Sequence, residues 1–412
     1  MTFRIDEDVK IELYGSTSFI IGESKLGGPA LLGDLSPTWH PLTCGVVSVD
    51  IDRGFSVNQS ILPTLEVGTA SIVLSGFAVD PTLNPLFELN AEIRVLIRPP
   101  GETEYSPIFT GFVDDIQTSY SADGYITTSM QCSDWLSKIL NVTVDEGAYV
   151  APEENFANRV NRIFDDFILP AYPDIEISPA WFPLYGGSTF PEEFGDRGTT
   201  TTGELLNEVM QGEAGMIVAS RTGVVYGFGR YYYDYLMDEL DLGTVGDDFG
   251  FSNQHSTSQD HFCMGDIETA FGKNDIANEI TARFSNNVAL AGPEEVVKRN
   301  TVSINALGNL PFDVDLYVAV GPTGSEDEQL QSWANDLTLP EGDTRVRSLT
   351  WSPIRRDGLL NNSWDWDPGY AITRVRIEYP SHNIDGKYIV SRLSHSITPE
   401  NWVMTAELWK GI

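Results

Sequence analysis

Alternating apolar and polar residues dominate the first third of the chain and predict β-strands there. The alternation runs through four segments: Val46–Asp52, Thr69–Ser75, Ala91–Arg98 and Tyr125–Cys132. Each segment is rich in β-branched residues and is bounded by glycine, proline, asparagine or aspartate. Pro99-Pro-Gly and Ala122-Asp-Gly supply turns between neighbouring strands. Short strands at this spacing are typical of a barrel or a sandwich, so we predict a β-barrel domain over residues 1–145.

The apolar period changes to that of a helix in the next segment. Phe156, Val160, Ile163, Phe164, Phe167 and Ile168 share one helical face, with Asp165 and Asp166 on the solvent side and Pro170 as the stop. A second helix begins at Thr201, where Thr201-x-x-Glu204 is a capping box. Its apolar face holds Leu205, Leu206, Val209 and Met210, and Gly212 or Gly215 ends it.

A β-hairpin follows the second helix. Met216–Ser220 and Val224–Phe228 are strand-like and flank the turn Arg221-Thr-Gly. We therefore predict a small α+β insert domain over residues 146–230. Residues 231–274 carry few periodic signals and several acidic clusters, which indicates a loop-rich acidic connector.

Strand patterns return in the last third of the chain. They are Ile280–Phe284, Val302–Ile304, Val346–Trp351, Arg374–Tyr379, Tyr388–Leu393 and Trp402–Trp409. One helix interrupts them, with Ser325-x-x-Glu328 as its capping box and Leu330, Trp333, Ala334 and Leu337 as its buried face. We predict a second β-barrel with one helix over residues 275–412. The fold class is mainly β, with two barrels, a small α+β insert and a connector.

Composition and charge narrow the classes of partner. Of the 412 residues, 41% are apolar, which excludes a disordered chain. Lysine and arginine number 25 against 60 aspartates and glutamates, a formal net charge of −35. So acidic a chain repels nucleic-acid phosphates and anionic membranes. No apolar run is long enough to span a bilayer, so no membrane insertion is expected, and the first residues lack the features of a signal peptide.

Candidate chemistry is sparse. The sequence has no G-x-S-x-G elbow, Walker A loop, H-E-x-x-H motif or EF-hand loop. The densest polar constellation is His255, Asp260, His261 and Cys263, which could hold a transition metal or could be a polar loop with an unpaired thiol; we favour the loop. The three cysteines, Cys44, Cys132 and Cys263, are too scattered for a disulfide framework, and Cys132 falls on a strand as a small buried residue.

Acidic pairs and tryptophans are the remaining candidates. Glu153-Glu154, Asp165-Asp166 and Glu192-Glu193 are adjacent pairs, whose side chains diverge on a strand or helix, so we interpret them as solvated surface. Six tryptophans lie in the last 80 residues or so: Trp333, Trp351, Trp364, Trp366, Trp402 and Trp409. We favour a core or an interface over a carbohydrate platform for them. The sequence thus indicates a protein that is not an enzyme, with no catalytic, cofactor-binding or metal residues assigned and no cofactor.

Read in order, several short motifs resemble the minor tail proteins of long-tailed phages. The carriers are Val47-Ser-Val-Asp-Ile-Asp-Arg-Gly, Gly68-Thr-Ala-Ser-Ile-Val-Leu, Asp80-Pro…Asn84-Pro, Ile93-Arg-Val-Leu-Ile-Arg, Pro107-Ile-Phe-Thr-Gly-Phe-Val-Asp-Asp-Ile and Cys132-Ser-Asp-Trp-Leu-Ser-Lys-Ile-Leu. Further matches are Met216–Tyr226, after a helix ending near Glu213-Ala-Gly, and Tyr388–Trp402. Residues 230–270 match nothing in this family.

The resemblance implies a hub at the tail tip, related to the central hub of contractile tails and to the base of the type VI secretion spike. In that family three subunits with two barrels each form a ring of six barrels, which adapts the sixfold tail tube to threefold tip components. The implied partners are two further copies in a homotrimer, a distal tail or tube-end ring protein, the tape-measure protein, and tip fibres, a spike or receptor-binding proteins. The protein would be made in the host cytoplasm and act in the virion.

The resemblance also implies that viral DNA crosses the ring without specific binding, during genome ejection. A negative channel wall would repel the phosphates, and we hypothesise that the acidic charge is concentrated there. Two alternatives stay open: a tail-associated hydrolase that cleaves cell-wall glycan or peptide, and a carbohydrate-binding receptor protein that uses the C-terminal tryptophans.

Overall fold

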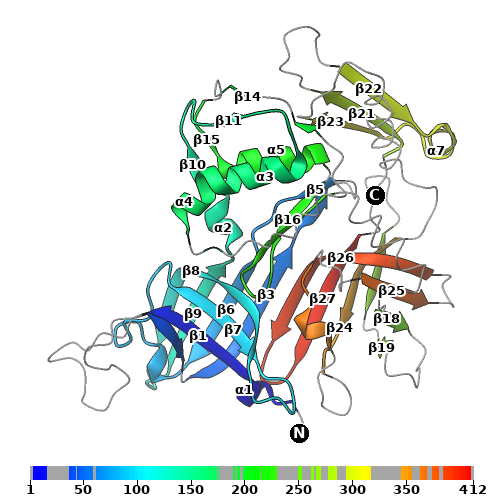
Figure 1. Ribbon diagram of the computed structural model, residues 1–412. Helices are drawn as coiled ribbons and strands as arrows, with labels where there is room; N and C mark the ends of the chain where they lie inside the picture. Colours follow the sequence, from blue (N-terminus) through cyan, green and yellow to red (C-terminus); the bar gives the residue numbers. More distant parts are fainter. Residues whose placement is uncertain are drawn as a thin grey trace.

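The computed structural model is mainly β, as the sequence predicts, and strands from both ends of the chain share one large sheet (Figure 1). The structure describes residues 3–15, 37–42, 44–58, 62–173, 175, 189–190, 193–194, 198–213, 215–229, 249–252, 261–263, 266–270, 277–284, 294–316, 345–354, 362–368, 374–379 and 384–409. The helix predicted near residues 325–337 lies outside these ranges.

The first half of the large sheet comes from residues 9–133. In the order in which they pair, its strands are β3 (Gly45–Gly54), β6 (Thr69–Ser75), β9 (Ile126–Ser133), β8 (Ser106–Tyr120), β7 (Glu92–Ile97), β1 (Val9–Gly15) and β2 (Thr38–Pro41). All these pairings are antiparallel. The short helices α1 (Ile5–Asp8), η1 (Phe77–Val79) and α2 (Leu136–Ile139) lie beside these strands in the chain.

The predicted turns of this half are present. Asp123 and Gly124 lie at the tip of the β8–β9 hairpin, where Ser121 donates to the carbonyl of Tyr125 and Gly124 has a φ of +81°. Gly101 has a φ of +94° in the turn between β7 and β8. Both glycines occupy the left-handed region, which a residue with a Cβ rarely enters.

The second half of the large sheet comes from the C-terminal part of the chain. Its strands are β18 (Phe249–Ser252), β19 (His261–Cys263), β20 (Ile267–Ala270), β24 (Arg345–Trp351), β25 (Arg374–Tyr379), β26 (Ile384–Ile397) and β27 (Trp402–Trp409). Strand β26 pairs with β27 along one edge and with β25 and then β3 along the other. It therefore joins the two halves of the sheet.

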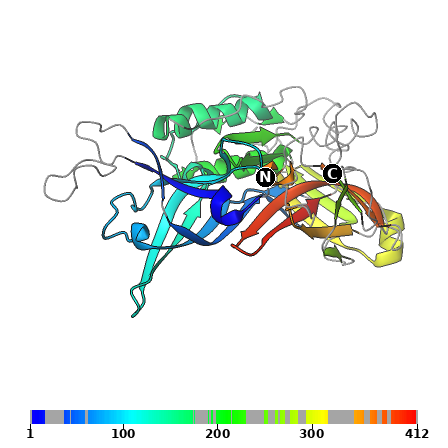
Figure 2. The same cartoon turned by 90° about the horizontal axis from the view of Figure 1, so that it is seen from below.

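The α+β insert lies on one side of the sheet (Figure 2). Helix α3 (Phe156–Ile163) continues through a π-helical turn, η2 (Phe164–Ile168), into α4 (Leu169–Ala171), and Asp165 and Asp166 are exposed as predicted. Helix α5 (Thr202–Glu213) follows, and then the hairpin of β16 (Met216–Ala219) and β17 (Val225–Phe228). The predicted capping box is present, since the backbone N–H of Glu204 donates to Thr201 Oγ1 at 3.2 Å and that of Thr201 donates to Glu204 Oε2 at 3.3 Å.

Short two-stranded pairings surround the insert. They are β10 (Thr143–Val144) with β15 (Thr200–Thr201), β11 (Val150–Ala151) with β14 (Glu193–Phe194), β12 (Glu154–Asn155) with β13 (Thr189–Phe190), and β4 (Ser56–Asn58) with β5 (Leu62–Thr64).

Residues 279–284, 294–299 and 311–316 form a small sheet that is separate from the large one. Strand β21 (Glu279–Phe284) lies between β22 (Glu294–Arg299) and β23 (Pro311–Leu316). The strand predicted at Val302–Ile304 is wrong, because helix α7 (Thr301–Leu307) covers these residues. The Asn300 side chain caps this helix by accepting from the backbone N–H of Ser303, and three alternating residues were too short a pattern to exclude a helix.

Two hydrophobic cores follow from this arrangement. One lies under both halves of the large sheet and includes Val49, Ile72, Leu393 and Trp402. The other belongs to the insert and includes Val160, Leu206 and Ile217, with Phe55 and Trp409 from the sheet packed into it. The described strands pair along an open path from β19 to β2, so the closed barrels stay a prediction.

Candidate assembly site

The junction between the two halves of the sheet depends on close backbone contact. Residues Arg392–Ile397 of β26 pair with Val49–Gly54 of β3, and a bulge displaces Ser391. The N–H of Phe55 donates to the Ser391 carbonyl at 2.9 Å. Gly54 has a φ of +133°, and a Cβ there would lie 2.2 Å from the Ser391 oxygen. Only glycine fits this crossing, so Gly54 is part of what holds the two halves together.

A buried ion pair stabilises the same junction on the core side of the sheet. The side chain of Arg53 is 1% exposed and donates to Asp367 Oδ1 at 2.6 Å and to the Trp366 carbonyl at 3.0 Å. The same Asp367 oxygen accepts from the backbone N–H of Arg221, at the tip of the insert hairpin, at 2.7 Å. One carboxylate therefore joins the first half of the sheet, the second half and the insert.

The Arg221 side chain extends this contact to both halves. Its guanidinium donates to the carbonyl oxygens of Asp365 at 2.9 Å and Pro107 at 2.8 Å. The Thr110 hydroxyl in turn donates to the Arg221 carbonyl at 3.0 Å. Because these bonds run between segments more than 100 residues apart, they fix how the modules sit relative to one another. We call the group Arg53, Arg221 and Asp367 the junction triad.

The face of the large sheet opposite the core is polar and continuous across the junction. Cross-strand partners lie on the same face, so the strand register aligns Asp115, Gln117, Ser129, Gln131, Ser71, Asp50, Asp52, Ser394, Ser396, Thr405, Glu407, Thr350, Ser348 and Glu268. We call this set the polar face. Most side chains on this face are hydroxyls, amides and carboxylates, and the same register also places Arg392, Val73 and Val403 there.

Hydrogen bonds connect side chains of the polar face from one strand to the next. Ser396 donates to Asp50 at 2.7 Å, and Gln131 donates to Ser71 at 3.0 Å. Arg392 holds both oxygens of Asp52, at 2.6 and 2.8 Å, and contacts Glu66. These bonds hold the side chains that form them in place on the face.

The polar face keeps a net negative charge. It carries the carboxylates of Asp50, Asp52, Asp115, Glu268 and Glu407, with Glu66 beside them. Three arginines nearby carry positive charge: Arg392, Arg376 on the neighbouring strand β25, and Arg347, whose charge acts on Glu407. Burial raises the pKa of Glu407, which the charge of Arg392 partly offsets.

The described part of the chain holds the thiols of Cys44 and Cys132, and neither is activated there. Cys132 is 2% exposed, which confirms the prediction of a small buried residue. Burial raises the pKa of the Cys44 thiol to about 11, so it is protonated at neutral pH. His40 Nε2 lies 3.1 Å from both the Gly15 carbonyl and Thr38 Oγ1.

Two of the four candidate metal ligands from the sequence lie outside the described residues. Residues 253–260, with His255 and Asp260, lie outside the described residues, and His261 and Cys263 are in β19. Elsewhere in the described part of the chain, no three histidine, cysteine, aspartate or glutamate side chains come together as metal ligands.

The acidic pairs separate in the structure. Glu154 is buried and forms ion pairs with Arg159 and Arg162, both at 2.9 Å, whereas Glu153 is exposed. This corrects the interpretation of that pair as solvated surface: Glu154 has an internal role because two guanidiniums surround it. Glu192 lies outside the described residues.

The C-terminal tryptophans are mainly core residues, as predicted. Trp351, Trp366, Trp402 and Trp409 are at most 4% exposed. Trp364 is half-buried, and Trp333 lies outside the described residues. Within the described ranges no helix combines the length and apolar character needed to cross a bilayer.

Comparison of the whole structure with solved structures identifies the fold. It is similar to the tail protein from Neisseria meningitidis MC58, with a TM-score of 0.56, 13% identity and 98% of each chain covered. It is also similar to the 43 kDa tail protein of prophage MuSo2 from Shewanella oneidensis, with a TM-score of 0.58, 12% identity, and 97% of this chain and 98% of that chain covered. No family model matches the sequence, and no curated protein matches it.

The fold is therefore that of phage tail proteins, over nearly the full length of both partners. The resemblance drawn from the sequence motifs is confirmed at the level of the fold. The junction triad and the polar face have no local sequence signal, because both depend on the pairing of residues 49–54 with residues 392–397.

Proposed function

We propose that the protein is a structural component of a phage virion and forms a homotrimeric hub at the tail tip. The observation that carries this proposal is the polar face, which extends from β8 through β3 and β26 to β24. A polar wall with a net negative charge suits a channel through which DNA passes, because it repels phosphates.

The junction triad supports a rigid role for this wall. A ring built from such subunits needs each subunit to hold its two halves in fixed register, and the triad ties both halves to the insert. We propose that the chain divides into residues 1–145, 146–230, 231–274 and 275–412, with the first and last supplying the ring. Strands β18, β19 and β20 bring parts of the third segment into the same sheet.

In the assembly, the hub would join the distal tail or tube-end ring to the tip fibres, spike or receptor-binding proteins, with the tape-measure protein inside. Three copies with two barrels each would adapt the sixfold tube to threefold tip components. This role requires no catalysis. The carbohydrate-receptor alternative relied on the C-terminal tryptophans, and four of these are buried in the cores.

The mass in solution tests the proposal. The chain weighs 45.5 kDa, so the trimer has a mass of 3 × 45.5 = 136.5 kDa. We expect light scattering over a concentration series to approach this mass and negative-stain images to show a ring. A dimer or a monomer at all concentrations would contradict the trimer, and a cell-wall clearing assay would then test the hydrolase alternative.

A further inference from the structure

The hairpin between β8 and β9 projects from the first half of the sheet. Figure 2 shows this hairpin, in cyan, extending beyond the neighbouring strands. Residues 121–125, which form its turn, are all exposed. The side chains of Tyr120 and Tyr125 are 59% and 75% exposed, and those of Phe77 and Leu83, on the segment that follows β6, are 76% and 71% exposed. We call residues 120–125 the hairpin tip.

Hydrogen bonds hold the segment of residues 76–83 against this hairpin. The backbone N–H of Gly76 donates to the Ile126 carbonyl at 3.1 Å, and the Tyr120 hydroxyl donates to Asp80 Oδ1 at 2.9 Å. Four of the ten large exposed apolar side chains in the described part of the chain therefore belong to this one end of the sheet. Such a concentration is typical of a surface that contacts another molecule.

The two tyrosines of the hairpin tip lie on opposite faces of the hairpin. Tyr120 is paired with Ile126, so these two side chains share one face. Side chains alternate along a strand, which places Tyr125, the residue before Ile126, on the other face. A flat partner surface would contact one of the two rings, whereas a groove that closes around the tip would contact both.

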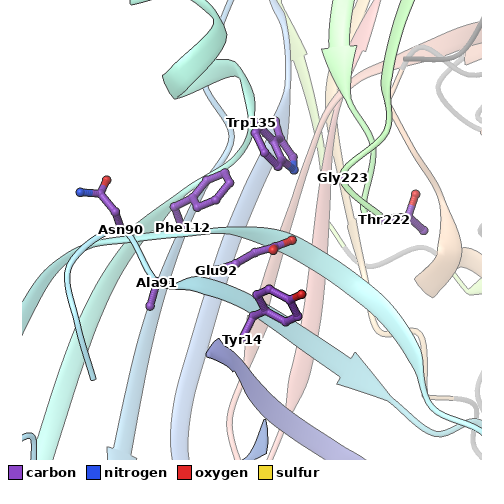
Figure 3. Close-up of a pocket in the computed structure, with 8 residues that line it drawn as sticks. All are labelled: Tyr14, Asn90, Ala91, Glu92, Phe112, Trp135, Thr222 and Gly223. Carbon is purple, nitrogen blue, oxygen red and sulfur yellow. The ribbon is translucent and has the colours of Figure 1, made fainter. Parts of the chain in front are cut away.

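The rings at this end of the sheet differ from other rings of the first half in having no internal partner. In the pocket of about 410 Å³ shown in Figure 3, the centroid of the Phe112 ring lies 3.3 Å from the protein's own Lys138 ammonium. Among the described residues, the rings of Phe77, Tyr120 and Tyr125 have neither a second ring nor a cation against them. Their faces are therefore available to a partner.

The charge at this end of the sheet is negative. Residues 76–90 and 114–130 together contain five carboxylates and neither lysine nor arginine. Asp123 is exposed in the turn itself and forms no ion pair within the part of the chain that the structure describes. Two hairpin tips would repel each other, because like charges face each other in such a contact, and a partner with positive charge is attracted instead.

We propose that the hairpin tip inserts into an apolar groove, rimmed by lysine or arginine side chains, on a different protein. Aromatic rings at the centre of a contact and charged groups at its edge are the usual composition of a protein interface. The hydrogen bonds that hold the tip reduce the conformational entropy lost on binding. The identity of the partner as a tail protein rests on the proposed function, whereas the chemistry of the tip does not.

Binding of β-cyclodextrins to the full-length protein tests this proposal, because each offers an apolar cavity to an aromatic ring. The probes are aminated, unmodified and carboxymethylated β-cyclodextrin, whose rims are positive, neutral and negative. Fluorine NMR of protein labelled with fluorotyrosine reports each site, and Tyr120→Phe and Tyr125→Phe assign the two signals. We expect the aminated host to bind at Tyr125 about fivefold more tightly than the neutral host, and the carboxymethylated host to bind more weakly than either.

Matched variants locate the charge that attracts the host. Asp123→Lys should lower the affinity of the aminated host at Tyr125 about tenfold. Glu102→Lys makes the same change of charge in the exposed turn at the other end of β8 and should leave this affinity unchanged. The fluorine signal of Tyr14 should not respond, because its ring already packs on that of Trp39, with centroids 5.2 Å apart. Circular dichroism checks that each variant is folded.

Three outcomes would overturn the proposal. The first is equal affinity of the three hosts at Tyr125, and the second is an equal effect of Asp123→Lys and Glu102→Lys. The third is a lower mass of the variant Tyr120→Ser with Tyr125→Ser in light scattering, which would show that the tip contacts a second copy of the chain. None of these results changes the mass of the wild type, so failure of this proposal and failure of the hub proposal are distinguishable.

Discussion

His395 is a buried histidine in β26. It is 1% exposed, its ring lies 5.9 Å from the Trp402 ring, and neither ring nitrogen has a hydrogen-bond partner in the described part of the chain. Burial, together with the charge of Arg53, lowers its pKa from the ordinary 6.5 to about 3. The ring is therefore neutral at pH 7, and it contributes packing rather than charge.

We predict that His395 makes the protein sensitive to acid. Between pH 6.5 and pH 3 the unfolded chain binds a proton at this position and the folded chain does not, so stability falls as the pH falls. The loss from pH 7 to pH 4 should be on the order of 3 kcal/mol. Urea unfolding of wild type and His395→Leu at both pH values measures it. An equal loss in the variant would contradict this assignment.

Asp134 gives the stability of the fold a pH dependence of the opposite sign. It is 2% exposed, and burial raises its pKa to about 7, although the backbone N–H groups of Gly68 and Leu136, each at 2.9 Å, favour the charged form. Between about pH 4 and pH 7 the folded chain binds one more proton at Asp134 than the unfolded chain does. The contribution of this group to the free energy of unfolding therefore falls as the pH rises. Asp134→Asn is therefore a useful companion to His395→Leu, because its effect on the pH slope has the other sign.

At the scale of elements, burial on both faces explains why β8 was among the strands that the sequence pattern did not predict. Residues 108–113 of β8 are all buried, because the insert hairpin covers the face that would otherwise meet solvent. A strand buried on both sides shows no alternation. The same lack of period hid β18, β19 and β20, which are only three or four residues long.

The junction triad should carry a large share of the stability between elements. Asp367→Ala leaves the Arg53 guanidinium buried without its carboxylate, so we expect a loss of about 3–5 kcal/mol in the free energy of unfolding. Urea unfolding measures the loss. The pair Arg53→Met and Asp367→Leu should recover much of it, since apolar residues can replace a buried ion pair.

A control for that experiment is the exposed pair Arg4 and Glu7. Their side chains are 57% and 54% exposed, so Arg4→Gln should leave the unfolding midpoint unchanged. An Asp367→Ala variant as stable as Arg4→Gln would contradict the structural role of the triad.

At the scale of the whole molecule, we expect the charge of the polar face to determine whether the protein binds DNA. We expect wild type to leave DNA mobility in a gel unchanged. The variant Asp50→Lys with Asp115→Lys places positive charge on this face and should retard DNA at low salt, with the effect lost at high salt.

The matched control for the polar face is Glu102→Lys with Glu153→Lys, two exposed residues outside it. This pair makes the same change in net charge, so equal retardation by both variants would show that total charge, rather than its position, controls contact with DNA. Light scattering of each variant checks that assembly is unchanged.

The sequence by itself determined the local elements of this protein. Period-two runs predicted β3, β6, β9 and β27, and the Thr201 capping box predicted α5, because these signals depend on neighbouring residues only. Short motifs in a fixed order also indicated the family whose fold the structure shares.

Only the tertiary structure decided how these elements form surfaces. The pairing of β3 with β26 joins residues some 340 positions apart, and no local pattern records that distance. The polar face and the junction triad both draw their side chains from strands that meet through such pairings. From the sequence alone, a carboxylate such as Asp367 is expected on the surface. It lies inside the protein because the fold brings Arg53 and Arg221 to it.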